Sequence, residues 1–157
     1  MKLTAQEEYG LRCLLQVARH APAGGEAVLS IRDVAEAEGL SVDYAAKILR
    51  ALRQVGFVTS ERGAAGGYRL ARDAVAIPLA EVLHALDAPL YDASFCEGFV
   101  GQQAQCVHQT SCAVRVLWRT LEGALEQALS GLVLADLLFD LPAVERKIDA
   151  RRVAVKA

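Results

Sequence analysis

Apolar residues in the first half of the chain recur every three or four positions, a spacing that predicts amphipathic helices. The first helix is expected to begin at Thr4, because Thr4 and Glu7 are spaced as a capping box, and to end near His20. The segment APAGGE follows and breaks the pattern, so this helix should not continue into the next apolar group. Its apolar positions are Leu11, Leu14, Leu15 and Ala18.

Two further helices are predicted on either side of a short turn. Ser30 fits the N-cap of one helix, and Gly39 suits the left-handed position at its end. Ser41 fits the N-cap of the next helix, which Gly56 ends. Two short helices joined by a glycine-containing turn indicate a helix-turn-helix, although an ordinary pair of antiparallel helices would show the same signals.

The segment FVTSERGAAGGYRLAR decides between these two interpretations. It predicts a strand at 57–59, a glycine-rich turn and a second strand at 68–70. Gly63, Gly66 and Gly67 are expected to supply positive φ for a tight, exposed hairpin. A hairpin directly after a helix-turn-helix is a wing. The predicted fold is therefore mainly α with a small β-hairpin wing, a winged helix-turn-helix.

The second half predicts one long helix outside this domain. Pro78 can begin a short helix, and a longer one is expected from about Ser111 to Leu129. Such a helix needs a partner surface, which a symmetric dimer supplies. Its apolar stripe is Leu117, Leu121, Ala124, Leu125, Ala128 and Leu132, widened by Val114 and Trp118. Four regions are expected: a winged helix-turn-helix DNA-binding domain (1–88), a cysteine-bearing loop (89–112), a dimerisation helix with a short apolar helix (111–141), and a basic tail with a disordered end (142–157).

Composition and motifs indicate the cellular compartment and argue against some classes of function. The chain has 157 residues, 54% of them apolar, yet no apolar run approaches the roughly 18 residues of a membrane span. The N-terminus lacks the apolar core of a signal peptide, so we expect a cytosolic protein without a membrane partner. No paired carboxylates, nucleophile–base set or phosphate-binding loop is present, which argues against an enzyme and a small-molecule substrate.

Net charge does not by itself predict a nucleic-acid partner, because the whole chain carries −2. DNA contact must instead come from local placement of basic residues. Around the third helix and the wing, seven side chains could reach base edges or phosphates of double-stranded DNA. These are Ser41, Tyr44, Lys47, Arg50, Arg53, Arg62 and Arg69. The alternative is an ordinary solvated helix face.

Three of the four cysteines lie in one polar segment, FCEGFVGQQAQCVHQTSC. In a cytosolic protein, clustered cysteines are more often metal ligands or redox thiols than disulfides. Cys96, Cys106 and Cys112 are therefore candidate metal ligands or redox thiols. Cys13 follows the helical pattern and is expected to be a buried small hydrophobic residue.

Several segments occur together in a recognisable order. They are MKLTAQEEYGLRCLL, SVDYAAKILRALRQVGFVTSERGAAGGYRL, IPLAEVLHALD, and the last two cysteines running into AVRVLW. In this order and at nearly this spacing they resemble the Rrf-type winged-helix transcriptional regulators, which include IscR-, NsrR- and RirA-like proteins. The resemblance covers nearly the whole chain. It implies a homodimer that binds a partly palindromic operator and, as in many members, an iron–sulfur cluster whose state switches DNA binding.

The resemblance also implies the cluster ligands, Cys96, Cys106 and Cys112. IscR-like members use a histidine three residues after the last cysteine, where this chain has Arg115. NsrR-like members use an acidic eighth residue donated by the partner subunit, and this chain has Glu8 there. The implied metal ligands are therefore three thiolates and Glu8, which favours a 4Fe–4S over a 2Fe–2S cluster.

Alternatives remain for the fourth ligand and for the function. Glu8 could be a solvated acid favoured by the helix dipole, and His108 could replace it as a ligand. His20 and His84 are expected to be plain surface or helix residues. A regulator sensing through thiols or zinc, or a winged-helix module that binds only proteins, would also fit these residues. The sensed signal, the operator and the sign of regulation do not follow from the sequence.

Overall fold

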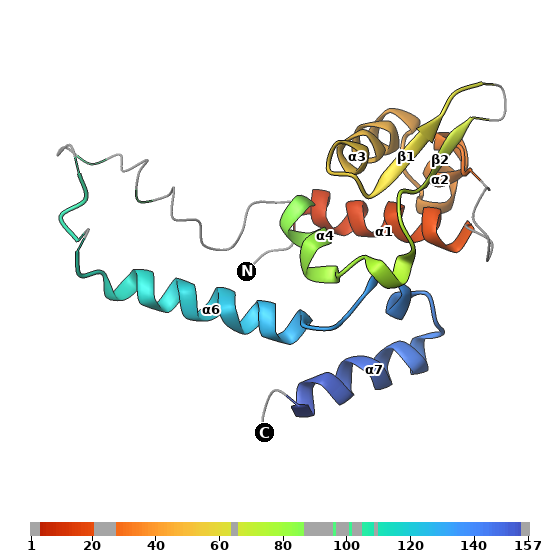
Figure 1. Cartoon of the computed structure of the whole chain (residues 1–157). Helices are drawn as coiled ribbons and strands as arrows, with labels where there is room; N and C mark the ends of the chain where they lie inside the picture. Colours follow the sequence, from red (N-terminus) through yellow and green to blue (C-terminus); the bar gives the residue numbers. More distant parts are fainter. Residues whose placement is uncertain are drawn as a thin grey trace.

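The computed structural model describes residues 4–20, 28–63, 66–86, 96, 101, 105–108 and 110–154. A compact group of helices carries a two-stranded hairpin, and two further helices lie outside it (Figure 1). The compact group contains α1 (Ala5–His20), α2 (Ile31–Glu38), α3 (Val42–Gln54), β1 (Val58–Glu61), β2 (Gly67–Leu70) and α4 (Leu79–Leu86). The outer helices are α6 (Ala113–Leu129) and α7 (Leu141–Ala154), and 3-10 turns occupy Ala74–Ala76 and Leu134–Leu137.

The helix starts predicted from the sequence are confirmed by their capping hydrogen bonds. The Thr4 N–H donates to Glu7 Oε2 at 2.7 Å, and the Glu7 N–H donates to Thr4 Oγ1 at 3.2 Å. Ser30 accepts from the Asp33 N–H, and Gly39 ends α2 with φ 65°. These local interactions fix where α1 and α2 begin, because the first backbone N–H groups of a helix have no partner within it.

The hydrophobic core lies where α1, α3 and α4 meet beneath the hairpin. Leu14 of α1, Leu49 and Leu52 of α3, and Val82 of α4 are fully buried, together with Phe57 at the start of the hairpin. Cys13 has no exposed surface, which confirms its prediction as a buried hydrophobic residue. The apolar face of α3 packs into this core, so the opposite face of α3 points to solvent.

The wing is an antiparallel hairpin in which Val58 pairs with Leu70 and Glu61 with Gly67. Of the three glycines expected to need positive φ, this is right only for Gly63, at 121°. The prediction is wrong for Gly66 and Gly67, whose φ is not positive. At these two positions glycine is needed because neighbouring backbone atoms leave no room for a Cβ. A Cβ on Gly67 would lie 2.5 Å from the carbonyl oxygen of Leu29, which pairs with Tyr68 through two 2.8 Å backbone hydrogen bonds.

The chain after α6 returns to the compact group. The Leu134 N–H donates to the Ile77 carbonyl at 2.8 Å, and the Leu79 N–H donates to the Leu132 carbonyl at 3.0 Å. Leu132 and Leu134 are buried in the core. The sequence pattern had placed Leu132 on the apolar stripe of the long helix, and this is wrong because α6 ends at Leu129 and the chain turns inward there.

The C-terminal region contains a helix that the sequence pattern did not predict, while the end of the tail, expected to be disordered, lies outside the described residues. Residues 134–137 form a 3-10 turn rather than an apolar α-helix, and much of the expected basic tail is the helix α7. Asp136 accepts from the Val133 N–H at 3.1 Å and forms an ion pair with Lys147 of α7. Lys147 also lies 4.8 Å from the ring centroid of Phe139. These contacts hold α7 against the 3-10 turn.

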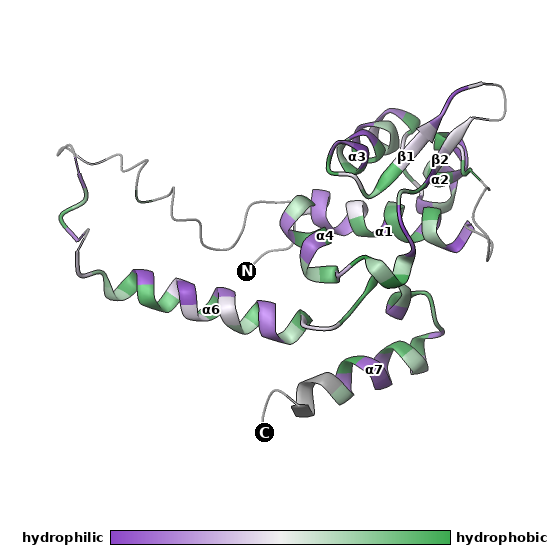
Figure 2. Ribbon diagram, viewed as in Figure 1, coloured by the Kyte–Doolittle hydropathy of each residue, from purple (hydrophilic) through white to green (hydrophobic). Residues whose placement is uncertain are grey.

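None of the side chains of α6 is buried. Apolar residues are nevertheless spread along it, as Figure 2 shows by hydropathy. The exposed large ones are Val114, Val116, Leu117, Trp118 and Leu121, with exposed fractions of 40% to 66%. Among the described residues, no helix combines the length and apolar character that a membrane span requires.

Candidate nucleic-acid interface and cysteine segment

The exposed face of α3 carries two of the basic residues predicted to contact DNA. Burial of Ala45, Ile48 and Leu49 on the core side leaves Lys47 and Arg50 exposed on the other. Both are long cations on a rigid helix, which is how a recognition helix presents donors to base edges and phosphates.

Ser41 and Tyr44, also predicted to contact DNA, have structural roles at the start of α3. The Ser41 hydroxyl accepts from the Tyr44 N–H at 3.2 Å and caps the helix. The Tyr44 ring is half-buried and makes an edge-to-face contact with Tyr9 of α1, with 5.9 Å between the centroids. Their backbone positions still lie at the helix end that meets a groove in helix-turn-helix proteins.

The other three arginines predicted to contact DNA lie at the end of α3 and on the wing. Two of them contact other side chains, and the third is exposed. Arg53 donates to Ser60 Oγ at 3.1 Å, which joins the end of α3 to the first strand of the wing. Arg69 forms an ion pair with Glu61 at 2.9 Å across the hairpin. Arg62 is exposed near the tip. Arg53 and Arg62 both line a hollow between the wing and the start of α2.

A further arginine in this hollow was missed by the sequence reasoning. Arg32 is exposed in the first turn of α2 and lines the hollow with Arg53 and Arg62. A cation in the first turn of a helix is disfavoured by the helix dipole, which prefers acids there. That local conflict is the signal that could have singled it out. Three arginines around one hollow make it suited to a phosphate or a narrow groove.

The cysteines of the polar segment form no disulfide. Cys96, Cys106 and Cys112 are each half-buried. Cys112 is the N-cap of α6, and its Sγ accepts from the Arg115 N–H at 3.4 Å. Among the described residues of this single chain, the three thiols are not gathered into one group of potential metal ligands.

Glu8, the predicted carboxylate ligand, is exposed on the first turns of α1. Its Oε1 lies 3.7 Å from Nη1 of Arg12, a loose ion pair between side chains that are both about half exposed. Arg12 bonds more closely to Glu38 of α2, at 2.5 Å, and this interaction raises the pKa of Arg12. Glu8 is thus held only weakly within its own chain. His108, the alternative ligand, is also exposed.

Comparison with known proteins identifies the family. The family model described as Rrf2, iron-dependent transcriptional regulator, matches residues 3–140. The chain belongs to the Rrf2 family. It is similar to Protein rrf2 of Nitratidesulfovibrio vulgaris, with 38% identity over 143 residues covering 89% of each chain. It is also similar to the HTH-type transcriptional regulator IscR of Vibrio vulnificus, with 33% identity over 92% of this chain and 82% of the relative.

Solved structures of Rrf2-type regulators have the same fold. CymR (YrzC), the global cysteine regulator of B. subtilis, superimposes with a TM-score of 0.67 at 27% identity, covering 88% of this chain and 96% of CymR. T. potens IscR superimposes with a TM-score of 0.65 at 28% identity, covering 88% and 86%. The chain is therefore an Rrf2-type transcriptional regulator with a winged helix-turn-helix. The mainly α fold with a small wing, predicted from the sequence, is confirmed.

Proposed function

We propose that this Rrf2-type regulator binds a DNA operator as a homodimer and that its binding depends on an iron–sulfur cluster held by Cys96, Cys106, Cys112 and Glu8. The observation that carries the DNA-binding part is the exposed basic face of α3 beside an arginine-bearing wing. Lys47 and Arg50 would enter the major groove, while Arg53 and Arg62 would contact the backbone or the minor groove.

The homodimer is supported by α6. Its apolar side chains are exposed in the single chain, with Leu117 at 54% and Leu121 at 42%. Continuous apolar surface on one helix favours burial against a partner. A second copy of α6 offers the same surface, so an interface with two-fold symmetry would bury both.

The cluster is supported by the chemistry of its donors. The chain has three thiols within 17 residues, none of them in a disulfide and one of them capping a helix N-terminus. Thiolates are soft ligands suited to iron. Glu8 supplies a fourth, oxygen donor that its own chain holds only loosely. When bound, the cluster would supply a group that changes with redox state or iron supply. Three thiolates and one carboxylate favour the 4Fe–4S type.

Anaerobic purification followed by a visible spectrum and by iron and sulfide counts tests the cluster. We expect a coloured protein with matched iron and sulfide, and a change in affinity for its own promoter region when the cluster is removed. A colourless, iron-free protein even after reconstitution would refute the cluster. Equal DNA affinity with and without the cluster would refute its regulatory role.

Regulation through thiols without a cluster is the second candidate. The observation that favours it is that all three thiols are only half-buried and none is in a disulfide, so an oxidant can reach them. A colourless protein whose promoter binding responds to an oxidant, and loses that response in a Cys106→Ser variant, would support this second candidate.

A further inference from the structure

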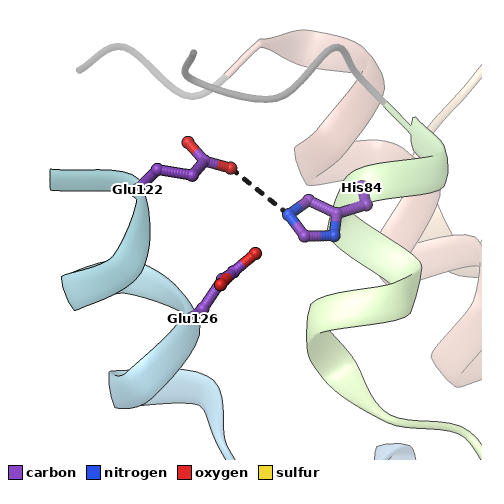
Figure 3. Close-up of side chains that lie close together, drawn as sticks. All are labelled: His84, Glu122 and Glu126. Carbon is purple, nitrogen blue, oxygen red and sulfur yellow. Dashed lines mark ion pairs between the residues drawn. The ribbon is translucent and has the colours of Figure 1, made fainter. Parts of the chain in front are cut away.

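A group of potential metal ligands lies away from the cysteines, between α4 and α6. It consists of His84 on α4 and of Glu122 and Glu126 on α6 (Figure 3). The sequence predicts His84 to be a plain surface or helix residue. It is exposed on α4, as predicted, and its ring is also directed toward both carboxylates (Figure 3). One donor atom from each residue lies within 4.8 Å of the others.

The spacing of the two glutamates brings them to one face of α6. Residues four apart on a helix are neighbours, so Glu122 and Glu126 project side by side and their like charges repel each other. His84 Nε2 lies 3.4 Å from Glu122 Oε1. The side chain of Glu122 is only 14% exposed, whereas that of His84 is 44% exposed. A divalent cation between the three would neutralise both carboxylates and use the nitrogen lone pair of neutral His84.

We propose that His84, Glu122 and Glu126 form a binding site for a divalent transition-metal ion such as Zn²⁺. One imidazole with two carboxylates suits Zn²⁺, Co²⁺ or Mn²⁺, whereas Mg²⁺ and Ca²⁺ prefer oxygen ligands throughout. Tetrahedral ligands at Zn–N and Zn–O lengths near 2.0–2.1 Å are about 3.3 Å apart. The His84–Glu122 pair already has this spacing. Glu126 is exposed, so its side chain can rotate and bring its carboxylate to the position of the third ligand.

Such a site has a mechanical consequence because its ligands come from two different parts of the molecule. α4 belongs to the core of the winged helix, where Val82 and Leu86 are buried. α6 has no buried residue of its own in the single chain. A metal ion bound by both helices would fasten α6 to the DNA-binding domain at a fixed angle.

Zinc titration calorimetry on the full-length chain tests the site. The thiols would compete for zinc, so the parent is the Cys96→Ser, Cys106→Ser, Cys112→Ser variant without an affinity tag. We expect one Zn²⁺ per chain, with affinity at least about tenfold lower in His84→Ala and in Glu126→Gln, since loss of even an outer-shell partner costs about 10–100-fold. His20→Ala, which removes an exposed histidine at the end of α1, is the matched control and should leave the affinity unchanged.

A second measurement keeps the thiols in place. Mn²⁺ prefers oxygen and nitrogen donors to thiolates, so its electron paramagnetic resonance signal in the chain with native cysteines reports this site. We expect the bound signal to be lost in His84→Ala and Glu126→Gln. No uptake of either ion, or uptake unchanged in both variants, would overturn the site. Neither assay involves DNA or the cluster, so the result is independent of the proposed function.

Discussion

At the scale of single residues, Gly67 shows how one missing side chain permits a tertiary contact. Its Cα lies against the carbonyl of Leu29, and this approach lets the segment before α2 pair with the second strand of the wing. Gly66 has the same function within the hairpin, where a Cβ would lie 2.5 Å from the carbonyl oxygen of Glu61. Backbone neighbours cannot rotate away as the end of a side chain can, so these positions tolerate no larger residue without movement of the strand.

We expect Gly67→Ala to lower the free energy of unfolding by about 1–3 kcal/mol, the usual cost of inserting a methyl group into a packed site. Urea unfolding measures the change. Gly123→Ala is the matched control, because nothing lies within 4 Å of its added Cβ and alanine favours a helix over glycine by about 1 kcal/mol. Equal destabilisation by both substitutions would contradict the role of the Leu29 carbonyl.

Cys13 should be the unreactive thiol of the four. Burial raises its pKa to about 12 from 9.0, with a smaller contribution from Glu38. Only the thiolate is nucleophilic, so at pH 8 iodoacetamide should modify Cys96, Cys106 and Cys112 of the cluster-free protein and spare Cys13. Peptide mass mapping measures this. Labelling in denaturant is the control and should reach all four thiols.

The raised pKa of Cys13 also affects stability above pH 9. The unfolded chain loses this proton near pH 9, whereas the folded chain keeps it until about pH 12. The folded state therefore binds more protons in this window, and Cys13 makes the free energy of unfolding fall as the pH rises through it. Cys13 labelling as fast as Cys106 at pH 8 would contradict both expectations.

At the scale of elements, α3 and the wing make the electrostatic contact with DNA testable. We expect Arg50→Ala to weaken promoter binding by about 1–3 kcal/mol if Arg50 contacts a base edge. If Arg50 contacts a phosphate instead, the slope of log affinity against log salt should shrink by about 0.9. Fluorescence anisotropy over a salt series measures both quantities.

Arg119→Ala is the control for this prediction. It removes the same charge from an exposed position on α6, outside the winged helix. The slope of log affinity against log salt for Arg119→Ala should match that of the unchanged protein. A loss of affinity in Arg119→Ala as large as in Arg50→Ala would indicate that net charge, rather than the face of α3, governs binding.

The apolar surface of α6 predicts where the homodimer can be broken. Leu121 is 42% exposed on this helix, and a glutamate there would have to be desolvated in an interface. We expect Leu121→Glu to give monomers in sedimentation velocity at micromolar concentration. Gln127→Glu adds the same charge at an exposed position on another side of α6 and should leave the dimer intact. Unchanged dimerisation of Leu121→Glu would place the interface elsewhere.

The sequence predicts helix starts correctly where the capping residues are close together in the chain. The Thr4–Glu7 capping box and the N-cap at Ser30 each involve residues only three positions apart, and both were predicted. The close approach of Gly67 to Leu29 and the return of Leu132 to the core join segments distant in sequence. The same applies to His84 with Glu122, which are 38 positions apart. Periodicity carries no information about such pairs, because they depend on how the helices pack.

At the scale of the whole molecule, α6 connects the cysteines to the DNA-binding domain. It begins at Cys112, its side chain Glu122 contacts His84 of α4, and the chain after it enters the core at Leu132. A change at the cysteine end would therefore reach the domain through one continuous helix. In a homodimer joined along α6, a tilt of this helix would change the separation of the two α3 helices, and so the fit to two half-sites.

The proposed cluster site draws Glu8 from the partner subunit, and mixed dimers test this directly. One chain carries Glu8→Ala, and the other carries Cys96→Ser, Cys106→Ser and Cys112→Ser. Neither homodimer has a complete ligand set. If Glu8 is donated across the interface, the mixed dimer regains one complete set, with thiols from one chain and the carboxylate from the other.

We expect the cluster absorbance to return in the purified mixed dimer, made by co-expression with two different tags, and to stay low in each homodimer. A Glu7→Ala chain is the matched control for the first partner. Glu7 serves the capping box of α1, so that change should lower stability while leaving the cluster in place. If the mixed dimer stays colourless while the unchanged homodimer is coloured, Glu8 is not donated across the interface. Full colour in the Glu8→Ala homodimer would remove Glu8 from the ligand set and leave His108→Ala as the next variant to examine.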